Sequence, residues 1–243
     1  MSIEIEWRVI KMGELYSSEI APIFDGLISF NKYKVIVEIG VAGAHTTRYL
    51  CEFAEKNDGF VYGFDIWERH GLKKQFKSSR FKLEKADELL KSYNLSNYEL
   101  IKVDTTTKEF EDILKEKCPV IDLAFIDGCH SYQGVKNDFD IVYPLLDSLG
   151  TIVFHDTLRI DGAREFMIDL RTIYFDGTFD IIDMPWGNLK RRVGISILKK
   201  RMYPTIKNLK IDEICGSPSK PKAIYEKERK WYERDLHNDY KKL

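Results

Sequence analysis

The stretch from Ile121 to Asp156, IDLAFIDGCHSYQGVKNDFDIVYPLLDSLGTIVFHD, decides the fold. Short apolar runs at 121–126 and 151–154 predict two buried strands. Between them, apolar residues at spacings of three and four predict a helix that runs through Leu146 and ends by Gly150. A strand, a helix and a strand in this order predict two parallel strands of one sheet, joined by a right-handed crossover.

Polar side chains follow both of these predicted strands. Asp127 and His130 come just after the first strand, and His155 and Asp156 come directly after the second. Parallel strands end at the same edge of a sheet, and ligands of open α/β sheets bind beyond that edge. We therefore expect these four residues to meet there, and we expect the chemistry of the protein at the same place.

The segment before this stretch predicts a nucleoside-binding site. A buried strand at 35–39 runs into the glycine turn 40–43, a helix follows, and a second strand at 60–64 ends in Asp65. Glycines between a strand and a helix let the backbone approach a ligand closely. A carboxylate about 20 residues farther along can bind both ribose hydroxyls.

Further apolar runs at 98–103, 179–183 and 193–198 complete the predicted sheet. The connection between the last two is too short for a crossover, so they pair antiparallel. The sequence thus predicts an α/β fold with a Rossmann-like, doubly wound, seven-stranded, mostly parallel sheet and an antiparallel last strand. Residues 1–34 form a predicted N-terminal helical extension, 35–200 the central domain, and 201–243 a charged C-terminal helical tail.

The composition narrows the class of protein. The 243 residues carry a formal net charge of -1, so no nucleic acid or anionic membrane is expected as a partner. No run approaches the roughly 20 apolar residues of a membrane span, and the N-terminus lacks a secretion signal pattern. The four cysteines form no C-x-x-C pair, which argues against a disulfide framework or a zinc site. We expect a reduced, cytoplasmic protein.

Successive motifs of the chain resemble those of class I S-adenosylmethionine-dependent methyltransferases. The motifs are VEIGVAGAHTT at 37–47, GFDIW at 63–67, VDTT at 103–106, FIDGCHSY at 125–132 and IVFHDT at 152–157. The paired I-D-G-x-H-x-Y and H-D motifs are similar to a subgroup of metal-dependent sugar O-methyltransferases of the macrocin type and cephalosporin hydroxylase-like proteins. The resemblance covers about 35–198 and implies O-methyl transfer.

The resemblance also implies site residues. It implies that the methyl donor is bound by Glu38, Gly40, Gly43, Thr46, Asp65, Ile66, Asp104, Thr105 and Asp127. It implies a divalent metal at Asp127, His155 and Asp156, with His130 near the transferred group. Two departures stand out: alanines occupy positions 42 and 44, where many methyltransferases have glycine, and His155 replaces a carboxylate. The identity of the metal therefore stays open. Magnesium is expected first, and manganese or iron are the alternatives.

A mechanism follows from these residue types. A metal held by two carboxylates and an imidazole can orient two oxygens of an acceptor and lower the pKa of the attacking hydroxyl. His130, three residues past Asp127, is placed to take the proton as general base. Each of these residues, taken alone, also has a structural alternative. His130 would cap the helix that follows residue 130, and Asp104 would cap the helix that follows residue 104.

Basic residues predict the acceptor. The residues expected above the active edge are Arg159, Arg164, the run Lys190, Arg191 and Arg192, and Trp186 in the same loop as that run. Arginine binds phosphate bidentately, and a tryptophan stacks on a base or a sugar face. With the sugar-modifying relatives, this points to a hydroxyl of a sugar, and specifically of a nucleotide-linked sugar. The alternative is that these cations are solvated.

Two other functions stay open at this point. Tyr132 and Lys136 fit the Y-x-x-x-K dyad of short-chain dehydrogenases that act on nucleotide sugars, although that class has a different glycine turn. The chain could also be a non-catalytic, donor-binding scaffold subunit. An aromatic stripe on the charged C-terminal helix favours docking on the chain's own domain or on a partner, and so a homodimer through the terminal helices.

Overall fold

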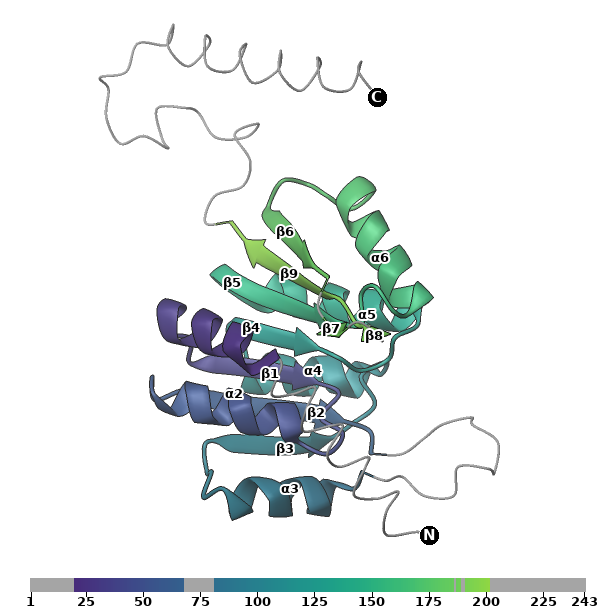
Figure 1. The fold of residues 1–243 in the computed structure, drawn as a ribbon. Coiled ribbons are helices and arrows are strands. Elements are labelled where there is room, and N and C mark those ends of the chain that lie inside the picture. Colours follow the sequence, from purple (N-terminus) through teal and green to yellow (C-terminus); the bar gives the residue numbers. More distant parts are fainter. Residues whose placement is uncertain (1–19, 68–80, 186, 189–190, 202–243) are drawn as a thin grey trace, which may run out of the picture. The chain divides into compact units, whose positions relative to one another are not determined.

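The computed structural model describes residues 20–67, 81–185, 187–188 and 191–201, with side chains for all of these except 187–188 and 191–192. They belong to one unit of the chain, residues 1–203 (Figure 1). The predicted extension 1–34 is described only from residue 20, where a helix spans 20–31. Apart from Arg201, the predicted tail 201–243 lies outside the described residues, so the predicted domain boundaries stay predictions.

A seven-stranded sheet forms the centre of this unit. Its strands are β1 (Val35–Ile39), β2 (Phe60–Asp65), β3 (Tyr98–Lys102), β4 (Ile121–Ile126), β5 (Leu146–His155), β6 (Phe179–Met184) and β9 (Ile195–Lys200). The order across the sheet is β3-β2-β1-β4-β5-β9-β6. The pairs from β3 to β5 are parallel, and β9 is antiparallel to both of its neighbours. The predicted doubly wound sheet with an antiparallel last strand is confirmed.

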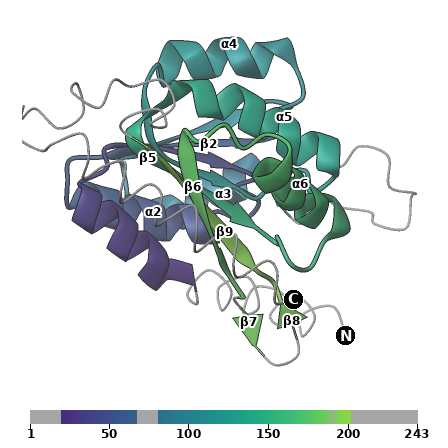
Figure 2. The ribbon, with the colours of Figure 1, turned by 90° about the horizontal axis from the view of Figure 1, so that it is seen from above.

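Helices cover both faces of the sheet. They are α2 (His45–Glu55), α3 (Leu83–Ser92), α4 (Lys108–Lys117), α5 (Tyr132–Val142) with the short 3₁₀ helix η1 (Tyr143–Leu145), and α6 (Asp161–Thr172). The 20–31 helix, α2 and α3 pack on one face, and α4, α5 and α6 pack on the other (Figure 2). No helix among the described residues is long and apolar enough to span a membrane.

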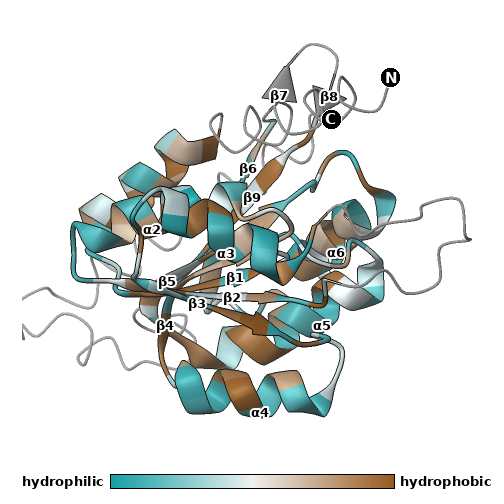
Figure 3. Ribbon diagram, turned by 90° about the horizontal axis from the view of Figure 1, so that it is seen from below, coloured by the Kyte–Doolittle hydropathy of each residue, from teal (hydrophilic) through white to brown (hydrophobic). Residues whose placement is uncertain are grey.

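Alternation along the strands explains the two cores. Successive side chains of a strand point to opposite faces. Ala124 and Ile126 of β4 therefore join the core under α4, α5 and α6, whereas Leu123 and Phe125 join the core under the 20–31 helix and α2. Hydrophobic residues accordingly concentrate in the strands and hydrophilic residues along the outer helix faces (Figure 3).

Two details differ from the predictions. The helix expected to run through Leu146 ends at Val142, because Pro144 lies in η1 and cannot continue an α-helix, and β5 begins at Leu146 rather than at 151. The connection between β6 and β9 is also not a plain loop. It contains a two-stranded ribbon of β7 (Gly187–Asn188) and β8 (Arg191–Arg192).

The two residues before β9 hold the loop that follows β5. Thr157 N donates to Gly194 O at 3.3 Å, and Leu158 N donates to Val193 O at 3.1 Å. Gly194 has φ +77°, and a Cβ there would lie 2.5 Å from the Leu158 side chain. A residue other than glycine would therefore be strained and would collide with this loop.

Candidate active site

The glycine turn after β1 packs directly on the loop that follows β4. Gly40 has φ +94°, and a Cβ on it would lie 2.3 Å from the carbonyl oxygen of Asp127. Asp127 N donates to Ile39 O at 2.8 Å, which fixes the two loops side by side. Ala42 and Ala44 also have positive φ values, 50° and 61°. The two alanines that depart from the glycine pattern thus keep left-handed backbone, at a steric cost that glycine would avoid.

Asp65, the predicted ribose ligand, braces this turn. One carboxylate oxygen accepts a hydrogen bond from Ala42 N at 2.8 Å, and the other accepts one from Trp67 N at 2.7 Å. The indole of Trp67 returns a hydrogen bond to Ala42 O at 3.1 Å. Each carboxylate oxygen has further lone pairs, so the carboxylate can still receive hydroxyls. Ile66 lies between these two residues and is half-buried.

Glu38 lies beneath the turn rather than on its surface. Its side chain is 1% exposed, and neither carboxyl oxygen has a hydrogen-bond partner among the described residues. Burial raises the pKa of Glu38 well above its usual range, and the nearby hydroxyl of Thr47 only partly opposes this rise. Glu38 is therefore a buried carboxyl that lies close to Thr47 in the first turn of α2.

The loop after β3 uses Asp104 as a turn residue. One oxygen of Asp104 accepts hydrogen bonds from Thr106 N at 2.9 Å and from Thr106 Oγ1 at 2.7 Å, just before α4 begins. The carbonyl of Thr105 accepts a hydrogen bond from the Asn137 side chain of α5 at 2.8 Å. The N-cap of α4 is Thr107, so Asp104 stabilises the turn before the helix and is not the predicted cap. Its predicted role beside the adenine stays a prediction.

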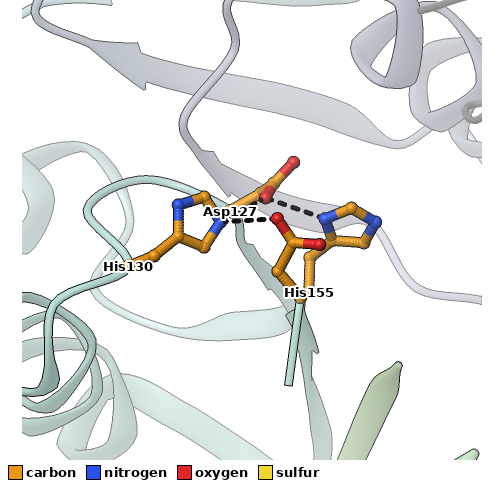
Figure 4. A group of neighbouring side chains, drawn as sticks. Asp127, His130 and His155 are labelled. Carbon is orange, nitrogen blue, oxygen red and sulfur yellow. Dashed lines mark hydrogen bonds and ion pairs between the residues drawn. The ribbon is translucent and has the colours of Figure 1, made fainter. Parts of the chain in front are cut away.

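Four polar side chains meet at the carboxyl ends of β4 and β5. One oxygen of Asp127, Oδ1, accepts hydrogen bonds from His130 Nε2 at 3.0 Å and from His155 Nδ1 at 2.9 Å (Figure 4). His130 Nε2 also lies 3.5 Å from Asp156 Oδ2. Each residue contributes one ligand-type atom, and these atoms all lie within 4.8 Å of one another.

The charges in this cluster support one another. Burial opposes ionisation of Asp127, but the two imidazoles outweigh it and lower the pKa of Asp127 to about 2. The hydrogen bond to Asp127 raises the pKa of His130. Burial opposes protonation of His155, yet the charge of Asp127 raises the pKa of His155 as well. Without a bound cation, the cluster is thus a carboxylate shared by two readily protonated imidazoles.

Asp156 completes the cluster from a strained backbone. It has φ 57°, a left-handed conformation that few residues besides glycine, asparagine and aspartate adopt, and it is buried. Strained residues of this kind concentrate at functional sites. The Arg159 guanidinium lies 4.0 Å from Asp156 Oδ1 and is half exposed. The turn after β5 therefore presents a carboxylate and a cation together.

A cavity of about 200 Å³ adjoins the cluster. Its lining comprises Gly40, Val41, Ala42, Gly43, His45, Thr46, Phe81, Phe125, Asp127, His155, Asp156, Arg159 and Val193. The structure thus brings together seven of the predicted site residues: Gly40, Gly43, Thr46, Asp127, His155, Asp156 and Arg159. Other predicted residues do not line this cavity, namely Glu38, Asp65, Ile66, Asp104, Thr105, His130 and Arg164. His130 nevertheless contacts the cluster at its rim.

Some predicted acceptor residues are placed elsewhere or cannot be placed. Arg164 pairs with Asp161 at 2.5 Å on an exposed surface. Trp186 lies outside the described residues, as do the side chains of Arg191 and Arg192, whose backbone forms β8. The predicted homodimer contact through the terminal helices falls mainly on residues outside the description as well. These expectations stay predictions.

Sequence reasoning missed part of the cavity wall. His45 begins α2 within a quoted motif, and Phe125 is one residue before the end of β4, so both had a positional signal. Phe81 and Val193 had none, because they reach the cavity from loops far away in sequence. Phe81 packs against the turn, since a Cβ on Gly43 would lie 3.1 Å from its ring.

The contacts of Tyr132 and Lys136 oppose the dehydrogenase alternative. The Tyr132 hydroxyl donates to Asp169 of α6 at 2.8 Å. Lys136 pairs with Asp140 at 2.5 Å along the surface of α5. Neither side chain lines the cavity, so the two do not form a catalytic dyad there.

Comparisons with known proteins agree with this geometry. A family model described as a methyltransferase domain matches residues 37–157. No curated protein sequence matches the chain significantly. Among solved structures, the chain is similar to the O-methyltransferase TomG from Streptomyces achromogenes in complex with S-adenosylmethionine, with 16% identity, a TM-score of 0.59, and coverage of 74% of this chain and 79% of that chain.

Two further structures show the breadth of the likeness. One is an O-methyltransferase from Bacillus cereus in complex with S-adenosylhomocysteine, with 16% identity, a TM-score of 0.55, and coverage of 74% and 80%. The other is an rRNA methylase from Streptococcus thermophilus, with 15% identity, a TM-score of 0.52, and coverage of 77% and 95%. At these identities the likeness shows the fold alone. The family match, together with the strand order and the glycine turn after β1, establishes that the chain belongs to the class I S-adenosylmethionine-dependent methyltransferases.

Proposed function

We propose that this methyltransferase transfers the donor's methyl group to a hydroxyl of a sugar, specifically a nucleotide-linked sugar, with the help of a divalent metal. The observation that carries the proposal is the convergence of Asp127, His130, His155 and Asp156 beside the cavity. Methyl transfer to an alcohol requires an oxygen that is deprotonated and held in line with the sulfonium, and this cluster supplies groups for both tasks.

The residues fit a metal ion. Asp127 is ionised at neutral pH, since its pKa is about 2, and two imidazole nitrogens point at the same oxygen of this carboxylate. Asp127, His155 and Asp156 would hold the ion. Carboxylates suit Mg²⁺ and Mn²⁺, whereas imidazole favours transition metals, so Mn²⁺ and Fe²⁺ join Mg²⁺ as candidates. When bound, such an ion lowers the pKa of a coordinated hydroxyl.

His130 is the proposed base. Its Nε2 atom lies at the rim of the cluster, 3.0 Å from Asp127 Oδ1 and 3.5 Å from Asp156 Oδ2. An imidazole gains and loses a proton near neutral pH, which suits a general base beside the acceptor hydroxyl. His155 is buried and directed at Asp127, which suits a ligand better than a base.

Arg159 supports an anionic acceptor. It lines the cavity beside Asp156, and its guanidinium is half exposed, so it can contact a bound molecule. Arginine recognises phosphate by paired hydrogen bonds. The diphosphate of a nucleotide sugar would meet this requirement, and the sugar diol would offer two adjacent oxygens to the metal.

The test is a methyl-transfer screen with radiolabelled S-adenosylmethionine against nucleotide sugars, free glycosides and catechols, each with added Mg²⁺, Mn²⁺ or Fe²⁺ and with EDTA. We expect labelled product from a nucleotide sugar, only in the presence of metal. Methylation of uncharged glycosides or catechols alone would overturn the acceptor, and turnover after exhaustive chelation would overturn the metal. Donor binding without any turnover across broad acceptor sets would favour the scaffold alternative.

A further inference from the structure

Asp138 is a buried carboxyl group that the proposed chemistry does not use. It lies on the inward face of α5, among Val135, Phe139 and Val142, and is 1% exposed. Neither of its carboxyl oxygens has a hydrogen-bond partner among the described residues. An unpaired buried carboxyl is costly, and such groups in folded proteins call for a physical explanation.

Two loops of the carboxyl edge meet at this group. We call residues 103–107 the β3 loop and residues 127–131 the β4 loop. A Cβ on Gly128 of the β4 loop would lie 3.6 Å from Asp138 Oδ2, so the carboxyl lies against that backbone. On the other side, the side chains of Thr105 in the β3 loop and of Asn137 in α5 are close enough to favour the charged form of Asp138, although neither forms a hydrogen bond of good geometry with it.

The neighbouring residue already ties α5 to one of these loops. Asn137 donates its side-chain amide to the carbonyl of Thr105 at 2.8 Å. Asn137 and Asp138 therefore face the same junction. The side chain of Asn137 forms a hydrogen bond there, whereas the carboxyl group of Asp138 forms none. The β3 loop carries residues predicted to bind the donor, and the β4 loop carries Asp127 and His130.

The chemistry of Asp138 suits a bridge between loops. Burial is the main reason that its pKa is raised, to about 7, and the charge of Asp104 acts in the same direction while His130 opposes it. A neutral carboxylic acid is thus well populated at neutral pH. Such a group both donates and accepts, whereas a carboxylate only accepts, so the acid can contact a hydroxyl and a backbone group at once.

We propose that Asp138 is a positioning residue that joins the β3 loop to the β4 loop when the methyl donor is bound. Donor binding would bring Thr105 and the backbone at Gly128 onto its two unpaired oxygens. Asp138 would thereby fix the donor's nucleoside end relative to Asp127 without touching the donor. The inference rests on the proposed donor site, because that site spans both loops.

The experiment compares three variants with the wild type, using S-adenosylhomocysteine as the probe. Asp138→Leu removes the polar atoms at similar volume, Asp138→Asn keeps two polar atoms that donate and accept, and Asp140→Asn is a matched control on the exposed side of the same helix. Calorimetry gives the dissociation constant, and thermal unfolding without ligand gives stability.

A positioning role predicts that stability and binding move in opposite directions. Asp138→Leu should unfold at the wild-type temperature or higher, since it removes an unpaired buried carboxyl, yet bind the probe at least about tenfold more weakly. Asp138→Asn should bind within about threefold of the wild type, and Asp140→Asn should bind like the wild type. If the leucine variant does not fold, Asp138→Ala takes its place with the same expectation for binding.

The outcomes separate the two proposals. Wild-type affinity in the leucine or alanine variant would overturn the positioning role and leave Asp138 as an unused buried acid. Loss of binding in Asp138→Asn equal to that in Asp138→Leu would also overturn it, because the amide retains both hydrogen-bonding functions. Failure of the wild type to bind S-adenosylhomocysteine would instead overturn the donor site itself.

Discussion

Asp65 and Ala42 are joined by a hydrogen bond of 2.8 Å from the Ala42 amide to the Asp65 carboxylate. The residue expected to bind the donor's ribose therefore also holds the left-handed turn that approaches the donor. A loss at Asp65 should consequently affect the donor site in two ways, through a missing ligand and through a loosened turn.

The first prediction concerns this carboxylate. Asp65→Ala should weaken S-adenosylhomocysteine binding by at least about tenfold, since hydrogen bonds to a charged group contribute about 1.5–3 kcal/mol. Isothermal calorimetry is the measurement. Asp112→Ala, at an exposed aspartate of α4, is the control and should bind normally. Unchanged affinity in Asp65→Ala would remove Asp65 from the donor site.

The second prediction concerns the metal. Exhaustive chelation should abolish methyl transfer while leaving donor binding largely intact, because two of the three predicted ligands, His155 and Asp156, are not among the predicted donor residues. Mn²⁺ titration followed by electron paramagnetic resonance should show one tight site, lost in Asp156→Asn. Equal Mn²⁺ binding by that variant and the wild type would contradict the ligand assignment.

The third prediction concerns the two imidazoles of the metal-free protein. The charge of Asp127 raises the pKa of both His130 and His155, so Asp127→Asn should lower both values. A raised histidine pKa stabilises the fold below the ordinary value of about 6.5, and this stabilisation disappears as pH rises through the folded-state pKa. The variant should therefore lose stability mainly at the acidic side of that window. Imidazole NMR titration measures the pKa values directly, with Asp161→Asn as the control.

The fourth prediction concerns stability at Asp138. Its pKa is about 7 when folded against an ordinary 3.8, so the native state binds more protons than the unfolded state between these values. Stability then falls as pH rises from about 4 to 7, and at pH 8 the buried charge costs on the order of a few kcal/mol. Asp138→Asn removes this dependence. Two other charged groups, Asp104 and His130, face Asp138. Both are present in the wild type and in the variant, so their contributions to the pH dependence of stability largely cancel.

Urea unfolding at pH 5 and pH 8 checks this expectation. The stability of Asp138→Asn relative to the wild type should increase from the lower to the higher pH. A difference that stays constant with pH would mean that Asp138 titrates in its ordinary range despite its burial.

The fifth prediction concerns the acceptor. Arg159→Ala should raise the KM for a phosphate-bearing acceptor by about tenfold, with little change in donor affinity, because the guanidinium lines the cavity and is half exposed. The matched control is Arg171→Ala, whose guanidinium pairs with Asp183 and does not line the cavity. If both variants raise KM equally, the effect is one of general charge and not of a contact.

Much of the fold could be predicted because parallel sheets leave strong local signals. Apolar runs located all seven strands, and the rule that parallel strands end at one edge brought Asp127 and His155 together. How deeply each side chain is buried was not predictable from the sequence. A motif identifies Glu38 by its position, but only the packed structure shows that its carboxyl is sealed beneath the turn. Phe81 and Val193 reach the cavity through tertiary packing, which no local pattern encodes.

The pairing of the loop after β5 with the two residues before β9 has a consequence for the order in which the site is completed. The matched methyltransferase segment ends at residue 157, but Thr157 and Leu158 find their backbone partners at Val193 and Gly194, more than a helix and a strand later. On a growing chain, β5 is an open edge until β9 has left the ribosome. A fragment ending soon after α6 would therefore contain every residue of the Asp/His cluster and still lack the backbone partners of Thr157 and Leu158, the two residues directly after that cluster.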